Sequence, residues 1–352
     1  MENELYIARC MQLAAQGGGY VAPNPMVGAV LVAEGKIIGE GHHCAFGQAH
    51  AETNAIANVD AQNEFLLSKS TLYVNLEPCA HYGKTPPCAE LIVRKKIPKV
   101  VVGTTDPNPK VAGQGIRILQ NAGIEVITGI LENECRELNK RFFTFIEKKR
   151  PYIFLKWAQT ADGFLDKKRE NAKEPPLVIS NELTKLLTHK IRTENQAIMV
   201  GTNTVLLDNP KLSARLWAGK NPVRLIIDAK CRIPKNFNVF DGTQPTIVFT
   251  EKMNNLQKEN VNFVNINFSK NFINNLLTAI YEQNINSVLV EGGANLLNSF
   301  IQSGLWDYAQ IEIAPFNIGS GIAAPTLAKL PTKETNYEGH RILEFENKMV
   351  AV

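Results

Sequence analysis

With 352 residues, 44% of them hydrophobic and 20% charged, the chain exceeds the usual size of one hydrophobic core, and we expect two domains. No apolar run reaches the roughly 18 residues of a membrane-spanning helix, the first residues lack a signal-peptide pattern, and six scattered cysteines form no disulfide framework; a cytoplasmic protein without a membrane partner is predicted. The formal net charge of +4 is too small to predict nucleic-acid binding by itself.

Residues 1–146 favour helices that alternate with strands, which predicts an α/β sheet with helices on both faces. Helices are expected over 3–16, 50–59, 88–95, 116–121 and 134–147. Strands are expected over 27–32, 36–40, 71–76, 99–104 and 125–130. Two prolines flank Asn24 and make its turn rigid, so Asn24 is either an ordinary turn residue or one presented to a ligand.

A group of zinc-binding residue types spans the segment from His50 to Cys88. The imidazole of His50 and the thiolates of Cys79 and Cys88 are three protein ligands for one zinc ion, with a fourth position open to water, as in catalytic sites. Zinc lowers the pKa of such a water toward ~7, and Glu52 is placed to carry its proton to a leaving amine. Taken alone, either cysteine would more simply be a small buried apolar residue. We expect the remaining cysteines to be small buried apolar residues of this kind; they are Cys10, Cys44, Cys135 and Cys231.

The combination of His50-Ala51-Glu52 with Pro78-Cys79 resembles the zinc-dependent nucleobase and nucleotide deaminases, although eight residues separate the cysteines here instead of two. The long spacing between the cysteines is also found in the riboflavin-biosynthesis deaminases, which this chain resembles. Three further motifs carry the resemblance: Pro23-Asn24-Pro25, Gly39-Glu40-Gly41-His42 and Asp106-Pro107-Asn108-Pro109. This resemblance implies a cytidine-deaminase-like three-layer α/β/α domain and hydrolytic deamination of 2,5-diamino-6-ribosylamino-4(3H)-pyrimidinone 5′-phosphate. It also implies that Asn24 helps to hold the pyrimidine.

The loop between the two cysteines, residues 80–87, is longer than metal geometry requires, and we expect it to shape the pyrimidine pocket. His81, Lys84 and Thr85 would line the substrate entrance. His81 is not expected to bind zinc, because the set of three ligands is already complete.

A charged segment that ends in Pro151 marks the boundary between a deaminase domain over 1–146 and a second domain over 147–352. The first domain carries 13 Lys and Arg against 14 Asp and Glu, whereas the second carries 25 against 20. The mild positive excess of the second domain suits an anionic small ligand.

The second domain also favours alternating strands and helices. Strands are expected over 151–156, 197–200, 223–228, 246–250, 287–290, 309–314 and 341–346, and helices over 181–194, 272–283 and 296–303. Gly292-Gly293, between a strand and a helix, would let backbone N–H groups approach a phosphate, although a tight turn is the ordinary explanation. The Gly-x-Gly-x-x-Gly fingerprint is absent.

Scattered residues of this domain are similar to the pyrimidine reductases that follow the deaminase in fused riboflavin enzymes; they are Asp162-Gly163, Arg192, Val200-Gly201-Thr202, Thr204, Asp208, Pro210, Leu212, Arg215 and Glu291-Gly292-Gly293. The resemblance implies a dihydrofolate-reductase-like α/β domain that reduces the ribosyl group to a ribityl chain with NADPH. It places NADPH near Gln159, Thr204, Asp208, Gly293, Ala294 and Asn295. It places substrate near Arg192, Leu212, Arg215 and Glu291.

Arg192 and Arg215 are suitable partners for a substrate phosphate because guanidinium binds phosphate with two parallel hydrogen bonds. Asp208 or Glu291 could assist as an acid. The segment Pro176–Ser180 departs from the reductases, since it lacks the serine and tryptophan of a Ser-x-Trp-Ile-Thr-like stretch.

The sequence therefore predicts a bifunctional enzyme with one Zn²⁺ per chain, NADPH, a phosphorylated pyrimidine substrate, no nucleic-acid partner and a homo-oligomeric state. One alternative is a zinc deaminase for another nucleotide or a tRNA base, with a degenerate or sensory second domain. Another is a structural zinc module beside a ligand sensor; a fourth protein ligand, for which His81 is the nearby candidate, would favour it.

Overall fold

The computed structural model describes residues 2–80, 86–108, 111–252, 258–269 and 271–347. The chain divides into two compact units, Met1–Lys149 and Arg150–Val352, three residues beyond the boundary expected from the sequence. Among the described residues, no helix is both long enough and apolar enough to cross a membrane.

In the first unit, five strands of the described chain form a sheet in the order β2-β1-β3-β4-β5. The strands are β1 (Gly28–Ala33), β2 (Lys36–His42), β3 (Thr71–Leu76), β4 (Lys99–Thr104) and β5 (Glu125–Thr128). β3, β4 and β5 run parallel, whereas β1 is antiparallel to both of its neighbours. The helices are α1 (Glu2–Ala15), α2 (Ala51–Ala57), the 3-10 helix η1 (Ala61–Lys69), α3 (Cys88–Arg94), α4 (Gln114–Asn121), α5 (Glu132–Leu138) and α6 (Lys140–Lys148).

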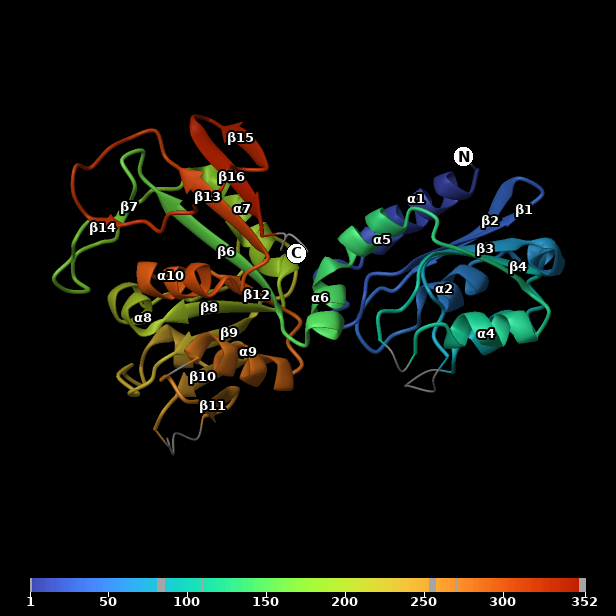
Figure 1. Ribbon diagram of the computed structural model, residues 1–352, viewed down its shortest axis with the longest axis horizontal. Coiled ribbons are helices and arrows are strands. Elements are labelled where there is room, and N and C mark those ends of the chain that lie inside the picture. Colours follow the sequence, from blue (N-terminus) through green and yellow to red (C-terminus); the bar gives the residue numbers. More distant parts are fainter. Residues whose placement is uncertain (1, 81–85, 109–110, 253–257, 270, 348–352) are drawn as a thin grey trace. The chain divides into compact units, whose positions relative to one another are not determined.

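Helices cover both faces of this sheet (Figure 1). On one face, Ile7 and Cys10 of α1 pack with Cys135 of α5 against alternate sheet residues such as Val30. On the other face, α2, α3 and α4 pack against the intervening residues, for example Leu31. Because successive side chains of each strand point to opposite faces of the sheet, the strands contribute to two separate cores. The predicted three-layer α/β/α arrangement is confirmed.

The single helix predicted over 134–147 is wrong, because the chain breaks at Asn139 into α5 and α6. The side chain of Asn139 accepts a hydrogen bond from Met26 N (2.8 Å) and donates one to Met26 O (2.9 Å). These two bonds satisfy the backbone of the segment that carries Asn24 and fix Asn139 outside helical geometry. A contact between residues 113 positions apart therefore overrides the local helical pattern.

The second unit contains a sheet of nine described strands in the order β11-β10-β9-β8-β12-β6-β13-β16-β15. The strands are β6 (Tyr152–Gln159), β8 (Ala197–Gly201), β9 (Val223–Ile227), β10 (Thr246–Thr250), β11 (Val261–Asn265), β12 (Ser287–Val290), β13 (Tyr308–Ile313), β15 (Lys333–Tyr337) and β16 (His340–Glu346). β7 (Phe164–Asp166) and β14 (Ile322–Ala323) form a separate pair. The strands from β11 to β13 run parallel, and β16 and β15 continue the sheet in antiparallel fashion.

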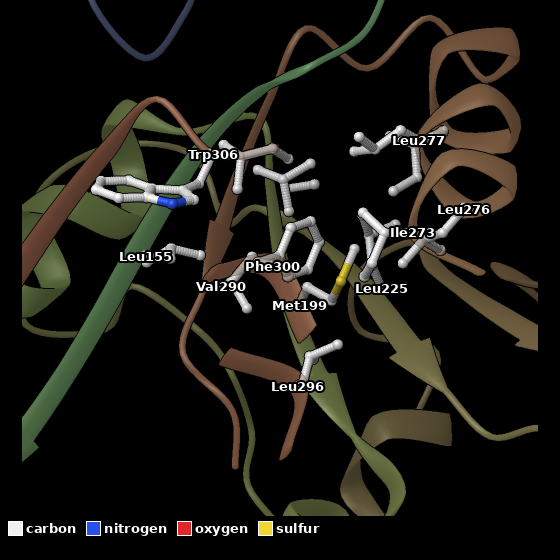
Figure 2. Packing of buried hydrophobic residues seen from close by; sticks show 14 of the residues in the cluster. Leu155, Met199, Leu225, Ile273, Leu276, Leu277, Val290, Leu296, Phe300 and Trp306 are labelled. Carbon is white, nitrogen blue, oxygen red and sulfur yellow. The ribbon is translucent and has the colours of Figure 1, made fainter. Parts of the chain in front are cut away.

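The helices of this unit are α7 (Glu182–Glu194), α8 (Thr202–Asp208), α9 (Phe272–Glu282) and α10 (Ala294–Ser303), with a short 3-10 turn η2 (Asn238–Phe240). α9 and α10 cover one face, where Phe300 is fully buried against Met199 and Leu225 of the sheet (Figure 2). On the opposite face, Ile191 of α7 and Val205 of α8 pack against Ile198 and its neighbours. Because the parallel strands all end at one edge, the loops that follow them converge there, where ligands bind in open α/β sheets.

Candidate active sites

Three potential metal ligands meet where two helices of the first unit begin. His50 precedes the first residue of α2, Cys88 is the first residue of α3, and Cys79 lies three residues beyond the end of β3. His50 Nδ1 lies 3.4 Å from the Sγ atoms of both Cys79 and Cys88, and the three ligand atoms lie within 4.8 Å of one another. One imidazole nitrogen and two sulfurs at this spacing fit a zinc ion with an open fourth position.

The charges around this cluster favour a cation. Hydrogen bonds from Cys88 and His50 hold the pKa of the Cys79 thiol well below its ordinary value, which favours the thiolate. The interaction with Cys79 and burial raise the pKa of Cys88. A divalent cation between the two sulfurs would relieve the resulting repulsion and bind both as thiolates.

The predicted proton carrier, Glu52, is only 3% exposed and points from the first turn of α2. Burial, together with the negative charge of Cys79, raises the pKa of Glu52 to about 7. A carboxyl group poised near neutral pH is suited to take up a proton and give it back.

His43 was not singled out by the sequence, yet it links Asn24 to the metal cluster. Its Nδ1 donates to the carbonyl of Ala49 (3.0 Å), and its Nε2 accepts from the amide of Asn24 (3.2 Å), a tautomer assigned from these partners. The ring lies edge-on to that of His50, with centroids 5.5 Å apart. Asn24 is therefore held in one orientation beside the candidate metal ligands.

Glu77 is a second residue whose importance the sequence did not reveal. Its carboxylate is 5% exposed and accepts backbone N–H groups of Asp106, Gly113, Gly115 and Ile116, at 3.0–3.4 Å. It thereby ties the segment after β4 and the start of α4 to the residue two positions before Cys79. A side chain that satisfies four backbone donors is a strong local anchor.

Residues 81–85 of the inter-cysteine loop lie outside the described residues, so the placement of His81, Lys84 and Thr85 at the substrate entrance stays a prediction. Of the cysteines predicted to be buried, Cys10 and Cys135 are buried. The prediction is wrong for Cys44, which is exposed in the loop before His50, and Cys231 is only partly covered.

The second unit has a cavity of about 730 Å³ at the edge where its parallel strands end. Six residues that the sequence assigned to cofactor or substrate line it: Thr204, Asp208, Glu291, Gly293, Ala294 and Asn295. Gly292 lies so close to β8 that a Cβ there would be 2.7 Å from Val200 Cα, and Gly293 has φ +55°. The turn thus needs both glycines, and it leads into α10, whose first turn carries no acidic residue. This arrangement fits the phosphates of a nicotinamide dinucleotide.

Four other predicted residues do not line this cavity. Gln159 accepts a hydrogen bond from the indole of Trp157 (2.8 Å), which does line it. Leu212 is buried in the core beneath α7, with φ +53°. Arg215 is exposed on the segment after Leu212.

Arg192, the fourth, is a partner of Glu291. Its Nε and Nη2 donate to the two carboxylate oxygens at 2.9 and 2.6 Å, and its Nη1 donates to Ser213 O. Burial would raise the pKa of Glu291, but the guanidinium outweighs burial and lowers it. Glu291 is therefore an oriented, ionised carboxylate at the cavity wall.

Arg169, which the sequence did not indicate, also lines the cavity. Its side chain donates to Asp166 Oδ2 (2.8 Å) and to Asp208, one of the predicted cofactor residues. A buried guanidinium between two carboxylates offsets negative charge that would otherwise repel a phosphorylated cofactor.

The departing segment Pro176–Ser180 has its own anchors beside the cavity. Leu177 N donates to Asp166 Oδ1 (2.9 Å), and Ser180 Oγ donates to the buried Glu312 (2.6 Å). Glu312 also lies 3.6 Å from Lys156 Nζ, and Lys156 reaches the cavity from β6. The segment is thus fixed against the cavity by polar contacts that need neither the serine nor the tryptophan of the reductase pattern.

Comparisons with known proteins agree with this two-part arrangement. The cytidine and deoxycytidylate deaminase zinc-binding region matches residues 1–104, and the RibD C-terminal domain matches residues 151–351. Fold and site therefore define a zinc-dependent deaminase joined in one chain to a reductase domain.

The particular family follows from full-length relatives. The chain is 42% identical to the riboflavin biosynthesis protein RibD of Aquifex aeolicus, over 90% of this chain and 88% of that protein, and 33% identical to the Escherichia coli protein of the same name, over 95% and 93%. The solved deaminase/reductase of Thermotoga maritima has a TM-score of 0.84 at 39% identity, and Acinetobacter baumannii RibD has 0.88 at 31%, each covering 98% of both chains. The chain belongs to the RibD family of bifunctional deaminase/reductases in riboflavin biosynthesis, which use Zn²⁺ and NADPH.

Proposed function

We propose that the first unit, residues 1–149, removes the 2-amino group of 2,5-diamino-6-ribosylamino-4(3H)-pyrimidinone 5′-phosphate, and that the second unit, residues 150–352, reduces the ribosyl group of the product. The observation that carries the first half is the His50-Cys79-Cys88 cluster with the buried Glu52 two residues from one ligand. The observation that carries the second half is the cavity around Gly292-Gly293.

In deamination, water adds to the ring carbon that bears the amino group, and ammonia leaves. When bound, zinc supplies a water of lowered pKa, and His50, Cys79 and Cys88 would hold the ion. Glu52 takes the proton of the attacking water and delivers it to the leaving nitrogen, which its pKa of about 7 permits in both directions. Asn24, oriented by His43, contacts the pyrimidine.

In reduction, the sugar carbon accepts a hydride and the substrate gains one proton. When bound, NADPH supplies the hydride, and the protein supplies alignment. We assign the cofactor to the Thr204, Asp208 and 293–295 side of the cavity. Glu291, held ionised by Arg192, faces the substrate, and Arg215 is an exposed cation for its phosphate.

Two alternatives from the sequence are not favoured. A deaminase for another nucleotide or for tRNA, with a degenerate second domain, would not have relatives that match the reductase part along with the deaminase part. A closed structural zinc site would need a fourth protein ligand, whereas the buried Glu52 beside His50 and the full-length deaminase/reductase relatives favour a catalytic site. A cytoplasmic location, a homo-oligomeric state and the absence of a nucleic-acid ligand stay predictions.

One assay with two readouts tests the proposal. The diaminopyrimidine ribonucleotide is supplied with NADPH, and ammonia release and the loss of NADPH absorbance are followed together. We expect both signals. Ammonia without NADPH oxidation would refute the reductase assignment, and NADPH oxidation without ammonia would refute the deaminase assignment.

The role of Glu52 is tested by Glu52→Gln. Glu64→Gln is the matched control, because Glu64 lies exposed on η1, where it pairs with Lys95. Loss of a general acid–base group should slow ammonia release about 10²- to 10⁴-fold while zinc content stays unchanged. Deamination at the unaltered rate with Glu52→Gln would remove Glu52 from this role.

A further inference from the structure

A buried carboxylate lies behind one wall of the large cavity in the second unit. Glu312 on β13 is only 1% exposed, and its two oxygens accept hydrogen bonds from Ser180 Oγ (2.6 Å) and Thr184 Oγ1 (2.7 Å). His340 Nδ1 lies 3.0 Å from the same carboxylate and donates to it in the tautomer that this contact requires. Donors from three separate segments thus fix the carboxylate in one orientation. A negative charge buried this deeply also requires a positive charge nearby.

Lys156 supplies that positive charge. β6 and β13 are adjacent and parallel, and Glu312 pairs with the residue two positions after Lys156. Because side chains alternate between the faces of a sheet, Lys156 and Glu312 lie on the same face, where Lys156 Nζ is 3.6 Å from Glu312 Oε2. Burial would raise the pKa of Glu312, but the charge of Lys156 and the hydroxyl donors outweigh burial and lower it. Glu312 is therefore an ionised carboxylate.

The side chain of Lys156 faces two cavities. It lines the large cavity together with Glu291, and it also lines a separate cavity of about 150 Å³ that residues of α7 and β13 border. Burial raises the pKa of Glu291, whereas Arg192 and, after it, the charge of Lys156 lower it. The ammonium thus lies within electrostatic range of the carboxylate that faces the substrate in the proposed reduction.

Glu312 offsets the charge of this ammonium without occupying its donors. A distance of 3.6 Å is longer than a hydrogen bond, and the ammonium makes no hydrogen bond to any residue that the structure describes. Its three N–H groups are therefore available to a ligand in the large cavity. Without Glu312, the flexible four-carbon side chain would be drawn toward Glu291, the other carboxylate within its range.

The place of this cation matters for the reduction. Addition of a hydride to the sugar carbon moves an electron pair onto the neighbouring heteroatom, which carries negative charge until it takes up a proton. A cation fixed beside that atom stabilises the charge as it develops. A displacement of about 1 Å in such an arrangement can slow a reaction about 10²-fold.

We propose that Glu312 is a positioning residue for the reduction, which holds the ammonium of Lys156 at the cavity wall beside Glu291. This inference rests on the proposed reductase function of the second unit. It also gives a role to the segment Pro176–Ser180, which departs from the reductase pattern, because Ser180 is one of the groups that fix Glu312.

The variant Glu312→Gln tests the proposal, because it keeps the size of the side chain and removes its charge. Calorimetric titration of the full chain with NADPH counts the folded second units, and kcat for the deaminated substrate is expressed per NADPH-binding site. We expect kcat per site to fall about 10- to 100-fold, while the Kd for NADPH stays within about twofold. A merely structural role would lower the number of sites and leave kcat per site unchanged.

Two further variants guard against a failure to fold. Glu312→Asp keeps the charge and should retain a higher kcat per site than Glu312→Gln. Thr184→Val removes one hydroxyl donor to Glu312 and keeps the branched shape of the side chain, so kcat per site should fall by a smaller factor, about threefold to tenfold.

Glu344→Gln is the matched control, because Glu344 is a carboxylate of the same small cavity that pairs with Lys333 instead of Lys156. Its kcat per site should stay within about twofold of the unaltered chain. An equal fall in this control would overturn the proposal. So would an unchanged kcat per site in Glu312→Gln, or in Thr184→Val if the first variant does not bind NADPH. Failure of the proposed reductase function would look different, since the unaltered chain itself would then oxidise no NADPH.

Discussion

The two candidate sites differ in how far apart along the chain their residues lie. The metal cluster is formed from His50, Cys79 and Cys88, next to the ends of α2, β3 and α3, which lie close together along the chain. The cavity of the second unit combines residues from Lys156 to Ile322, which lie at the ends of several strands. A short-range site follows from residue type and spacing, whereas a long-range site depends on which loops the sheet order brings together. Variants that separate the two sites test this difference.

The largest effect is expected from removing a metal ligand. Losing only an outer-shell partner of a metal ligand typically lowers metal affinity or activity 10- to 100-fold. Loss of a ligand itself should cost more, so Cys88→Ser should lower ammonia release by more than about 100-fold. Metal analysis should show the loss of one zinc per chain. Reduction of the deaminated substrate by NADPH should continue.

Cys44→Ser is the control for that change, since Cys44 is exposed and lies in the same unit. It should keep both zinc and deamination. Full zinc occupancy in the Cys88→Ser chain would contradict the assignment of Cys88 as a ligand.

The second expected effect is that of Glu77→Gln. The carboxylate of Glu77 now accepts hydrogen bonds from four backbone N–H groups. The amide nitrogen of glutamine cannot accept them, so the first unit should lose about 2–3 kcal/mol of stability. Urea unfolding followed by ammonia release measures it. The exposed Glu64→Gln should leave stability almost unchanged, and an equal loss in both variants would refute the anchoring role of Glu77.

A smaller effect, confined to the second unit, is expected from Arg169→Ala. It leaves Asp166 and Asp208 as unpaired carboxylates at the cavity, and their charge should raise the KM for NADPH about tenfold. Steady-state kinetics at two salt concentrations would show the rise shrinking as salt screens the carboxylates. An unchanged KM would show that Asp208 lies away from the cofactor.

The smallest effect concerns pH. Burial, with the nearby Arg192 and Arg215, lowers the pKa of His189 to about 4. The unfolded chain binds a proton at this residue near pH 6.5, whereas the folded chain does not until about pH 4. Acidification between these values therefore destabilises the fold, by about 1–2 kcal/mol at pH 5 once solvent screening is allowed for. His189→Asn should reduce the fall of the unfolding midpoint between pH 7 and pH 5; an identical fall would exclude His189 as its source.

The regular parts of the fold could be predicted because their patterns are local. β3, β4, β10 and β12 have the bounds expected from sequence, and the side chain of Asn181 caps α7 by accepting from Thr184 N. α8, where no helix was expected from the sequence, has a tertiary cause. α8 begins with Thr202-Asn203-Thr204, poor helix formers, and Thr202 is held by a hydrogen bond to Ile227 O (2.6 Å) on the next strand.

The same distinction explains which site residues were found. Glu52 and the metal cluster carry a recognisable spacing. His43, Glu77 and Arg169 are recognisable only by what they contact, and the bidentate Arg192–Glu291 pair joins residues 99 positions apart. Such partners follow from strand order, which no pattern along the chain specifies.

The most direct test of two separate sites in one chain compares Glu52→Gln with Gly292→Val. A side chain at Gly292 would clash with Val200, so the second variant should release ammonia normally and oxidise no NADPH. The first should release ammonia about 10²- to 10⁴-fold more slowly, yet reduce the deaminated substrate at the unaltered rate. Loss of both activities in either variant, with the chain still folded, would contradict the account.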